Sequence, residues 1–134
     1  MKIIINEKIP NWNEYINKER ANKYGANKLK QEEKLLMKQI TKGQKFTGEY
    51  PIEIIVTKHF KKYIGDLDNV RIKGILDGLV ANGVIADDSN MFIRKITYLA
   101  KIDKKDFIEL EIKEYDIEWY SNNNYNNNSS VSNK

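Results

Sequence analysis

The sequence predicts a single α+β domain, in which helices pack mainly on one face of a mixed four-stranded β-sheet. The first observation is length, because 134 residues suit one domain and allow a core. The second is the order of the periodic segments, which is strand, helix, strand, helix, strand, strand, with no internal repeat of useful length. The third is a change of composition after residue 119, which separates a domain at 1–119 from a tail at 120–134.

The amino-terminal third predicts a short strand followed by helical structure. A β-branched run within residues 2–6 predicts the strand. Asn11 or Asn13 can cap a helix, and Gly25 interrupts the helical pattern before Gly43 ends it, so two helices or one bent helix fit. The apolar residues at helical spacing before this end are Leu29, Leu35, Leu36, Met37 and Ile40.

The middle of the chain predicts a strand and then a helix. Residues 51–57 alternate between two faces, which is typical of a strand with one buried face. Residues 69–82 place apolar side chains at the spacing of a buried helical stripe, and Asp68 or Asn69 would cap that helix. The apolar residues are Ile52, Ile54 and Val56 in the strand, and Ile72, Ile75, Leu76 and Leu79 in the helix.

Two glycines, Gly74 and Gly78, lie inside this expected helix. Glycine in a helix interior costs about 1 kcal/mol relative to alanine, so the pair needs a reason. A backbone that passes close by would provide one. The domain's own sheet and a partner subunit are both possible neighbours, and we expect the sheet because it is the commoner arrangement.

The last part of the folded chain predicts two strands. Residues 92–102 and 108–113 alternate between apolar and polar side chains, and turn residues 103–105 separate them. We therefore expect an antiparallel hairpin. Beyond Trp119 the chain consists mainly of Asn, Ser and Tyr, which bury too little apolar surface to fold, so we expect residues 120–134 to form a disordered tail.

Composition favours a cytoplasmic protein without a membrane partner. Charged residues make up 31% and apolar residues 40% of the chain, and no apolar run approaches the length of a membrane helix. The amino end lacks the pattern of a secretory signal. The absence of cysteine excludes disulfides, thiol catalysis and cysteine-ligated zinc. The single histidine, His59, excludes a three-histidine metal site and disfavours a histidine-centred nuclease mechanism.

Positive charge is concentrated in one segment. Residues 11–45 contain nine basic and four acidic residues, whereas the whole chain has a net charge of +4. A basic arm beside an acidic centre suits a bound polyanion, although a lysine-rich helix is about as often a solvated surface. Trp12, Tyr15 and Tyr24 lie among these cations and could stack on unpaired bases, but such aromatic residues are more often core. The candidate DNA-binding residues of this segment are Arg20, Lys23, Lys28 and Lys30.

An acidic cluster is the feature that most needs a ligand. Asp66 and Asp68 precede the second main helix, and Asp87 and Asp88 precede the third strand, so we expect the two loops to meet at one edge of the sheet. Carboxylates brought together raise one another's pKa unless divalent ions bind between them. Magnesium binds carboxylate and phosphate oxygens, and a two-metal pair promotes phosphodiester hydrolysis. Lys73 could place a cation on the phosphate as charge develops.

Each acidic element alone is also a common cap or turn, so the combination has to be considered. The chain contains Asp66-Leu67-Asp68-Asn69, Lys73, Asp77-Gly78-Leu79 and Asp87-Asp88-Ser89-Asn90. In this order they resemble the DLDN, K, DAL and DDS elements of the RusA-type Holliday junction resolvases of bacteria and their phages. The four elements lie within residues 66–90, about a fifth of the chain, and are specific as a set.

The resemblance implies a RusA-like fold and a homodimeric endodeoxyribonuclease that depends on Mg²⁺, with Mn²⁺ as a possible substitute. Such an enzyme resolves four-way DNA junctions by paired, symmetric nicks. By the same resemblance, Asp66, Asp68 and Asp88 would be the metal-binding catalytic carboxylates and Lys73 the catalytic lysine. Asp88, rather than Asp87, matches the essential aspartate of the family.

The chain departs from the family pattern at two places. One additional residue separates Asp68 from Lys73, which affects the placement of the lysine. Gly65 stands where a basic residue often precedes the first aspartate, so a phosphate contact is either lost or supplied by Lys61 or Lys62.

Two other functions remain open at this point. One is a metal-dependent nuclease that acts on flaps, forks or other branched DNA. The other is a DNA-binding protein of the same fold without catalysis, in which the aspartates only cap and turn.

Overall fold

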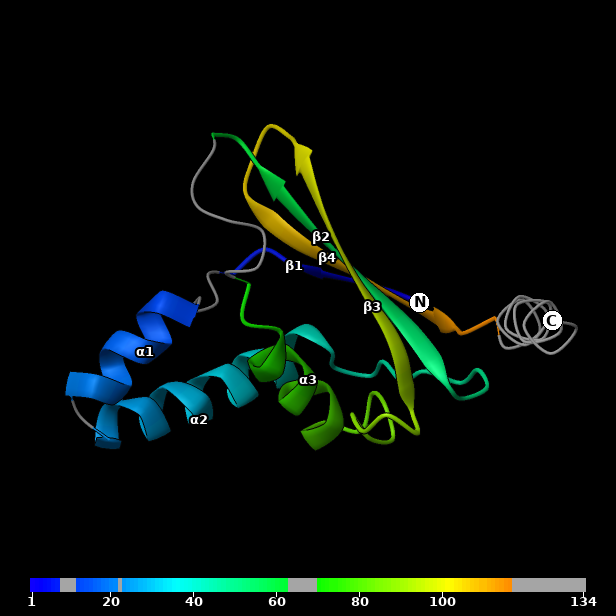
Figure 1. Cartoon of the computed structure of the whole chain (residues 1–134), viewed down its shortest axis with the longest axis horizontal. Coiled ribbons are helices and arrows are strands. Elements are labelled where there is room, and N and C mark those ends of the chain that lie inside the picture. Colours follow the sequence, from blue (N-terminus) through cyan, green and yellow to red (C-terminus); the bar gives the residue numbers. More distant parts are fainter. Residues whose placement is uncertain (8–11, 22, 63–69, 117–134) are drawn as a thin grey trace, which may run out of the picture.

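The computed structural model describes residues 1–7, 12–21, 23–62 and 70–116 (Figure 1). Asp66, Asp68, Asn69 and the expected tail at 120–134 lie outside the described residues. None of the described helices is both long and apolar enough to cross a bilayer. The elements are β1 (Lys2–Ile5), α1 (Trp12–Ala21), α2 (Lys23–Ile40), β2 (Ile52–Phe60), α3 (Ile72–Ala81), β3 (Ile93–Ile102) and β4 (Phe107–Glu114).

The strands form one mixed four-stranded sheet in the order β1-β4-β2-β3, so the predicted α+β class is confirmed. β2 and β3 are parallel, whereas β4 pairs antiparallel with both β1 and β2. The parallel pair requires a crossover connection, and α3 provides it. Alternate strand residues are buried on the side of the sheet where the helices lie (Figure 1). The core includes Ile3, Ile5, Ile52, Ile54, Val56, Leu110 and Ile112 from strands, with Met37, Ile75 and Leu79 from helices.

The expected hairpin of the last two strands is wrong, because β2 lies between β3 and β4. The connection from β3 to β4 crosses the end of β2, where the backbone N–H of Asp103 donates to the carbonyl of Phe60 at 2.8 Å. The backbone N–H of Lys61 donates to Asp106 Oδ1, also at 2.8 Å. A short connection can therefore cross over one strand instead of joining neighbours.

The helix boundaries correct two further expectations. The break between helices lies after Ala21, and Gly25 is inside α2 rather than between two pieces. α3 begins at Ile72 with Arg71 at the N-cap position and without a side-chain cap hydrogen bond, so the expected cap at Asp68 or Asn69 is wrong. Contacts of the Arg71 side chain with the other helices, described below, hold the start of α3 in place of a local cap.

Gly74 and Gly78 do allow a close approach, but the neighbour is α2 and not the sheet. A Cβ atom at Gly74 would overlap the Glu33 carboxylate and the Arg71 guanidinium. A Cβ atom at Gly78 would lie 2.6 Å from Cγ of Met37, which is shorter than real Cβ contacts. Both glycines therefore let α3 pack closely against α2.

Candidate functional site

The structure describes two of the four residues expected to form the catalytic site. Lys73 lies in the first turn of α3, and Asp88 lies in the segment 82–92 that joins α3 to β3. Asp66 and Asp68 belong to residues 63–69, which are outside the described part of the chain. The meeting of the three aspartates therefore stays a prediction.

Lys73 presents its ammonium group to solvent. Its side chain is 63% exposed, and its Nζ lies 3.9 Å from Oδ1 of Asp77, four residues later on the same helix. This ion pair confirms the pairing that the sequence spacing allows. An exposed pair of this kind contributes about 0.5 kcal/mol or less, so it leaves the lysine able to turn towards a phosphate.

The segment that carries Asp88 is fixed at the other end of α3. The backbone N–H of Phe46 donates to the carbonyl of Val84 at 2.8 Å, and that of Ala86 donates to the Tyr50 hydroxyl at 2.9 Å. Val84 itself is buried. Lys73 lies in the first turn of α3, whereas Asp88 lies seven residues beyond the end of this helix at Ala81, and the ten residues of α3 make about 15 Å of helix.

The two neighbouring aspartates of this segment have different surroundings. Oδ1 of Asp87 accepts the backbone N–H of Asp88 at 2.8 Å, and Asp87 is half-buried. Asp88 is exposed, and its carboxylate has no hydrogen bond or ion pair to any residue that the structure describes. Asp87 therefore shapes the turn, whereas the oxygens of Asp88 remain available to a metal ion. Among the described residues, no three His, Asp or Glu side chains are grouped to hold a metal by themselves.

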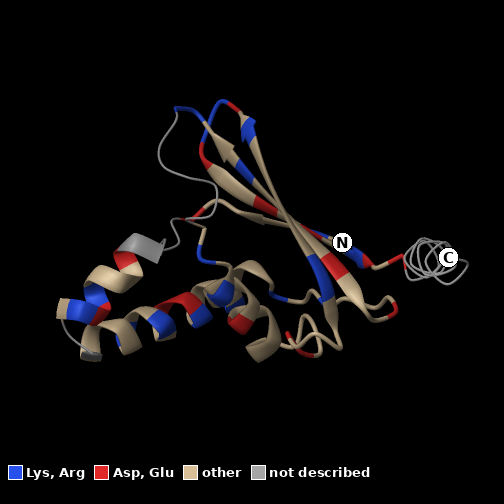
Figure 2. Ribbon diagram, in the orientation of Figure 1, with Lys and Arg blue, Asp and Glu red and all other residues tan. Residues whose placement is uncertain are grey.

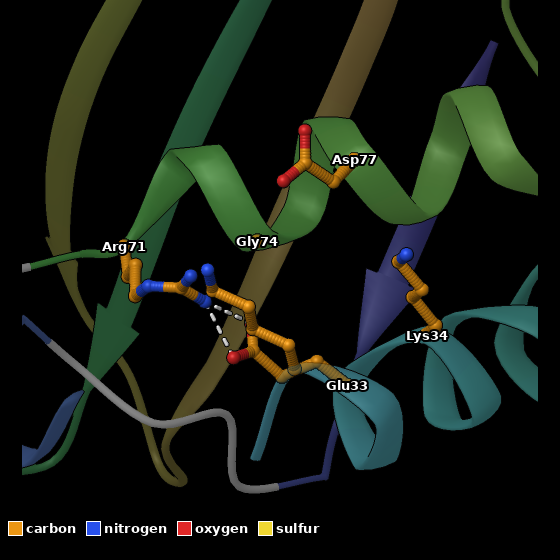
Figure 3. Close-up of a pocket in the computed structure, with 6 residues that line it drawn as sticks. Glu33, Lys34, Arg71, Gly74 and Asp77 are labelled. Carbon is orange, nitrogen blue, oxygen red and sulfur yellow. Dashed lines mark hydrogen bonds and ion pairs between the residues drawn. The ribbon is translucent and has the colours of Figure 1, made fainter. Parts of the chain in front are cut away.

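A buried ion pair next to the acidic motif was missed by the sequence reasoning. Arg71 and Glu33 are 3% and 4% exposed, and Arg71 Nη1 donates to both carboxylate oxygens, at 2.6 Å for Oε2 (Figure 3). The ring of Tyr15 covers the guanidinium, with 4.0 Å between the arginine Cζ and the ring centroid. Tyr15 comes from α1, Glu33 from α2 and Arg71 from the residue before α3, so three helices meet at this cluster.

Electrostatic effects on this cluster oppose one another. Burial raises the pKa of the Glu33 carboxyl, and the positive charge and hydrogen bonds of Arg71 offset part of that rise. Lys30 Nζ lies 5.5 Å from the Tyr15 ring centroid, and interaction with Tyr15 raises the pKa of Lys30. Lys30 is therefore partly engaged by the fold, although its side chain is exposed.

A small polar pocket of about 210 Å³ lies between α2 and α3 beside this ion pair. Figure 3 shows Glu33 and Lys34 reaching it from α2 and Asp77 from α3, with Gly74 leaving room for the pair. The ion pair of Arg71 and Glu33 forms one side of this pocket and joins the start of α3 to α2. Its lining residues are Lys30, Glu33, Lys34, Arg71, Gly74 and Asp77.

The expected DNA-binding cations fall into two groups in space. Basic residues follow α1 and α2, and a second group lies at the far end of the sheet, where β2 and β3 end and β4 begins (Figure 2). Every described member of both groups is exposed, and the side chain of Lys23 is outside the described residues. The first group contains Arg20, Lys28 and Lys30, and the second contains Lys61 and Lys62.

Two comparisons with known proteins do not identify the chain. No protein-family model matches it, and no curated protein matches it. The functional assignment therefore depends on the residues themselves and on the geometry given above.

Proposed function

We propose that this chain is a magnesium-dependent endodeoxyribonuclease that resolves four-way DNA junctions by paired, symmetric nicks. The observation that supports it most is the set of Asp66 and Asp68, Lys73 and Asp88, in the order seen in RusA-type resolvases. The alternatives are a metal-dependent nuclease on flaps or forks and a DNA-binding protein without catalysis. The proposal includes a homodimer, because two symmetric nicks need two active sites. It also includes a cytoplasmic location.

The donor set fits the metal. Asp66, Asp68 and Asp88 would hold Mg²⁺, with Mn²⁺ as a substitute, since carboxylate oxygens are the ligands that these ions prefer. The exposed and unengaged carboxylate of Asp88 supports this role. A bound ion would supply charge stabilisation at the phosphate and a more acidic water molecule.

The other side chains would position the nucleic acid. Lys73, exposed in the first turn of α3, would bind a phosphate oxygen as negative charge develops. The cations of α1 and α2 would bind the backbone of the DNA arms without reading the base sequence. These residues are Arg20, Lys23, Lys28 and Lys30.

A cleavage assay tests the proposal. The substrates are a synthetic four-way junction, a flap, a fork and a linear duplex, each with Mg²⁺, Mn²⁺ or EDTA. We expect paired nicks in the junction that require the metal. We expect Asp68→Asn to abolish cutting and to preserve junction binding, whereas Glu32→Gln, which replaces an exposed carboxylate on α2, should cut normally.

The outcomes separate the three functions. Unchanged cutting by Asp68→Asn would eliminate the proposed site. Cutting of flaps or forks in preference to junctions would favour the second function. Tight binding without cutting in any metal would favour the third.

A further inference from the structure

At one tip of the sheet, away from the helices, β2 and β3 end and β4 begins (Figure 1). The last residue of β2, Phe60, pairs with the last residue of β3, Ile102. The turn of residues 103–106 then crosses the end of β2 to reach β4. We call the surface formed here the strand tip, and its charged residues are Lys61, Lys62, Lys101, Asp103, Lys104, Lys105 and Asp106.

The strand tip gathers lysines that are distant in sequence. Lys61 and Lys62 follow β2, whereas the other three come from the end of β3 and the turn, about forty residues later. All five lysine side chains are exposed. Figure 2 shows basic residues on this end of the sheet. The sequence reasoning missed Lys101, Lys104 and Lys105 because only the crossing of β2 brings them to Lys61.

The carboxylates of the strand tip are occupied by N–H donors rather than by lysine ammonium groups. Asp106 Oδ1 accepts the backbone N–H of Lys61 at 2.8 Å. Asp103 Oδ1 accepts the backbone N–H of Lys104 at 2.6 Å, which holds the pKa of Asp103 below its usual range. Within the described part of the chain, none of the five lysine ammonium groups forms an ion pair. With five lysines and two aspartates, the strand tip keeps a net positive charge that is available to a ligand.

The surface is also held in one geometry. His59 is buried, its Nδ1 lies 3.0 Å from Oδ2 of Asp103, and its ring stacks on Phe107 with 4.0 Å between centroids. Lys105 Nζ lies 5.5 Å from the centroid of the same Phe107 ring. These contacts join the turn to β2 and β4, so the lysines project from an ordered base.

We propose that the strand tip binds the phosphate backbone of one arm of the branched DNA. An excess of exposed lysines on an ordered surface matches a polyanion, and phosphate contacts of this kind position the nucleic acid. Lys62 precedes Asp66 by only four residues, so the strand tip is close in sequence to the acidic motif. The identity of the ligand depends on the proposed function, because that function makes DNA the substrate.

The test compares two triple variants of the full chain. One is Lys101→Gln/Lys104→Gln/Lys105→Gln at the strand tip. The matched control is Lys2→Gln/Lys95→Gln/Lys113→Gln, which removes three exposed lysines of β1, β3 and β4 that lie outside both groups of candidate DNA-binding cations. Fluorescence anisotropy measures binding of a labelled four-way junction over a series of KCl concentrations, with Ca²⁺ in place of Mg²⁺ to prevent cutting.

We expect the tip variant to bind about tenfold more weakly at moderate salt, with a salt slope smaller by about 2 to 3. The control should change the slope by less than about 1. Circular dichroism and the Tm show whether each variant is folded. If the triple variant at the strand tip is unstable, the binding measurement is repeated with Lys101→Gln/Lys104→Gln, which keeps the contact of Lys105 with Phe107.

Two failures are distinguishable. Equal slopes in the tip variant and the control, with a wild-type chain that binds and cuts junctions, would overturn only the strand-tip site. A wild-type chain that binds no DNA would overturn the proposed function and this inference together.

Discussion

The guanidinium of Arg71 and the carboxylate of Glu33 form an ion pair that is buried where α1, α2 and α3 meet. The Tyr15 ring closes the cluster from α1. Because Arg71 precedes α3 directly, the pair fixes the start of the helix on which Lys73 lies. A buried pair adds little compared with apolar residues of similar volume, but removal of one partner leaves an uncompensated charge.

Arg71→Met should lower the free energy of unfolding by about 3–5 kcal/mol, because it leaves the Glu33 carboxylate buried without its cation. The double variant Glu33→Met/Arg71→Met should recover most of that loss. Urea denaturation of both variants measures the difference, and Lys34→Met, at an exposed position on α2, is the control. A loss below about 1 kcal/mol for Arg71→Met would contradict the importance of the pair.

The loss in Arg71→Met should depend on pH. Burial raises the pKa of Glu33, and without Arg71 the offset disappears. When folding raises the pKa of a carboxyl group, the contribution of that group to the free energy of unfolding is fully present below its pKa in the unfolded chain, about 4.3 for glutamate. This contribution is lost as the pH rises through the pKa of the group in the folded chain. The deficit relative to wild type should therefore be smaller at pH 5 than at pH 8. Urea midpoints across this range that shift in parallel for both proteins would refute it.

The sequence predicted the strands and their faces but not their neighbours. Ile52, Ile54 and Val56 alternate because one face of β2 is buried, and all three are in the core. Ile54, however, pairs with Ile96 on one side and Ile112 on the other. Periodicity reports which face is buried and carries no information about which strand is adjacent, so the central place of β2 was not predictable from it.

The helix packing shows a similar limit. Leu35 was counted among the apolar residues of the helical pattern but is 62% exposed, whereas Glu33 is buried. The available signal was the position of Glu33, four residues after Leu29 and four before Met37, in line with the buried side of α2. A carboxylate at such a position indicates a buried cation, but only the structure shows that this cation is Arg71. Of the proposed site, the structure describes only Lys73 and Asp88, since the other two aspartates lie outside the described residues.

Gly78→Ala should destabilise the chain, although alanine favours helices by about 1 kcal/mol. The new Cβ would meet Met37, a buried side chain that is 1% exposed, and overpacking costs about 1–3 kcal/mol. In a Met37→Ala background the same change should be neutral or stabilising, because it fills the space left by the methionine. A double-mutant cycle by urea denaturation should therefore show coupling of about 1 kcal/mol or more, and additive effects would disprove the contact.

Lys73→Met should lower kcat for junction cleavage by about 10²- to 10³-fold with little change in junction affinity. The physical reason is that the ammonium group would stabilise charge that develops only during the reaction. Asp77→Asn removes the partner of Lys73 and should leave kcat within about twofold, because the exposed pair is weak. Single-turnover cleavage with Mg²⁺ measures both, and equal effects of the two changes would indicate that Lys73 acts through the ion pair.

Asp88→Asn should reduce cleavage to the level seen with EDTA, whereas Asp87→Asn should retain most of it. The Asp88 carboxylate is exposed and unengaged among the described residues, so its charge is available to a metal ion. Asp87 uses Oδ1 to accept the N–H of Asp88, and an asparagine oxygen can accept the same hydrogen bond. Single-turnover cleavage at increasing Mg²⁺ measures both variants on the same junction, with binding in Ca²⁺ as the check on folding. Equal losses would mean that both carboxylates bind metal, and full activity of Asp88→Asn would remove this aspartate from the site.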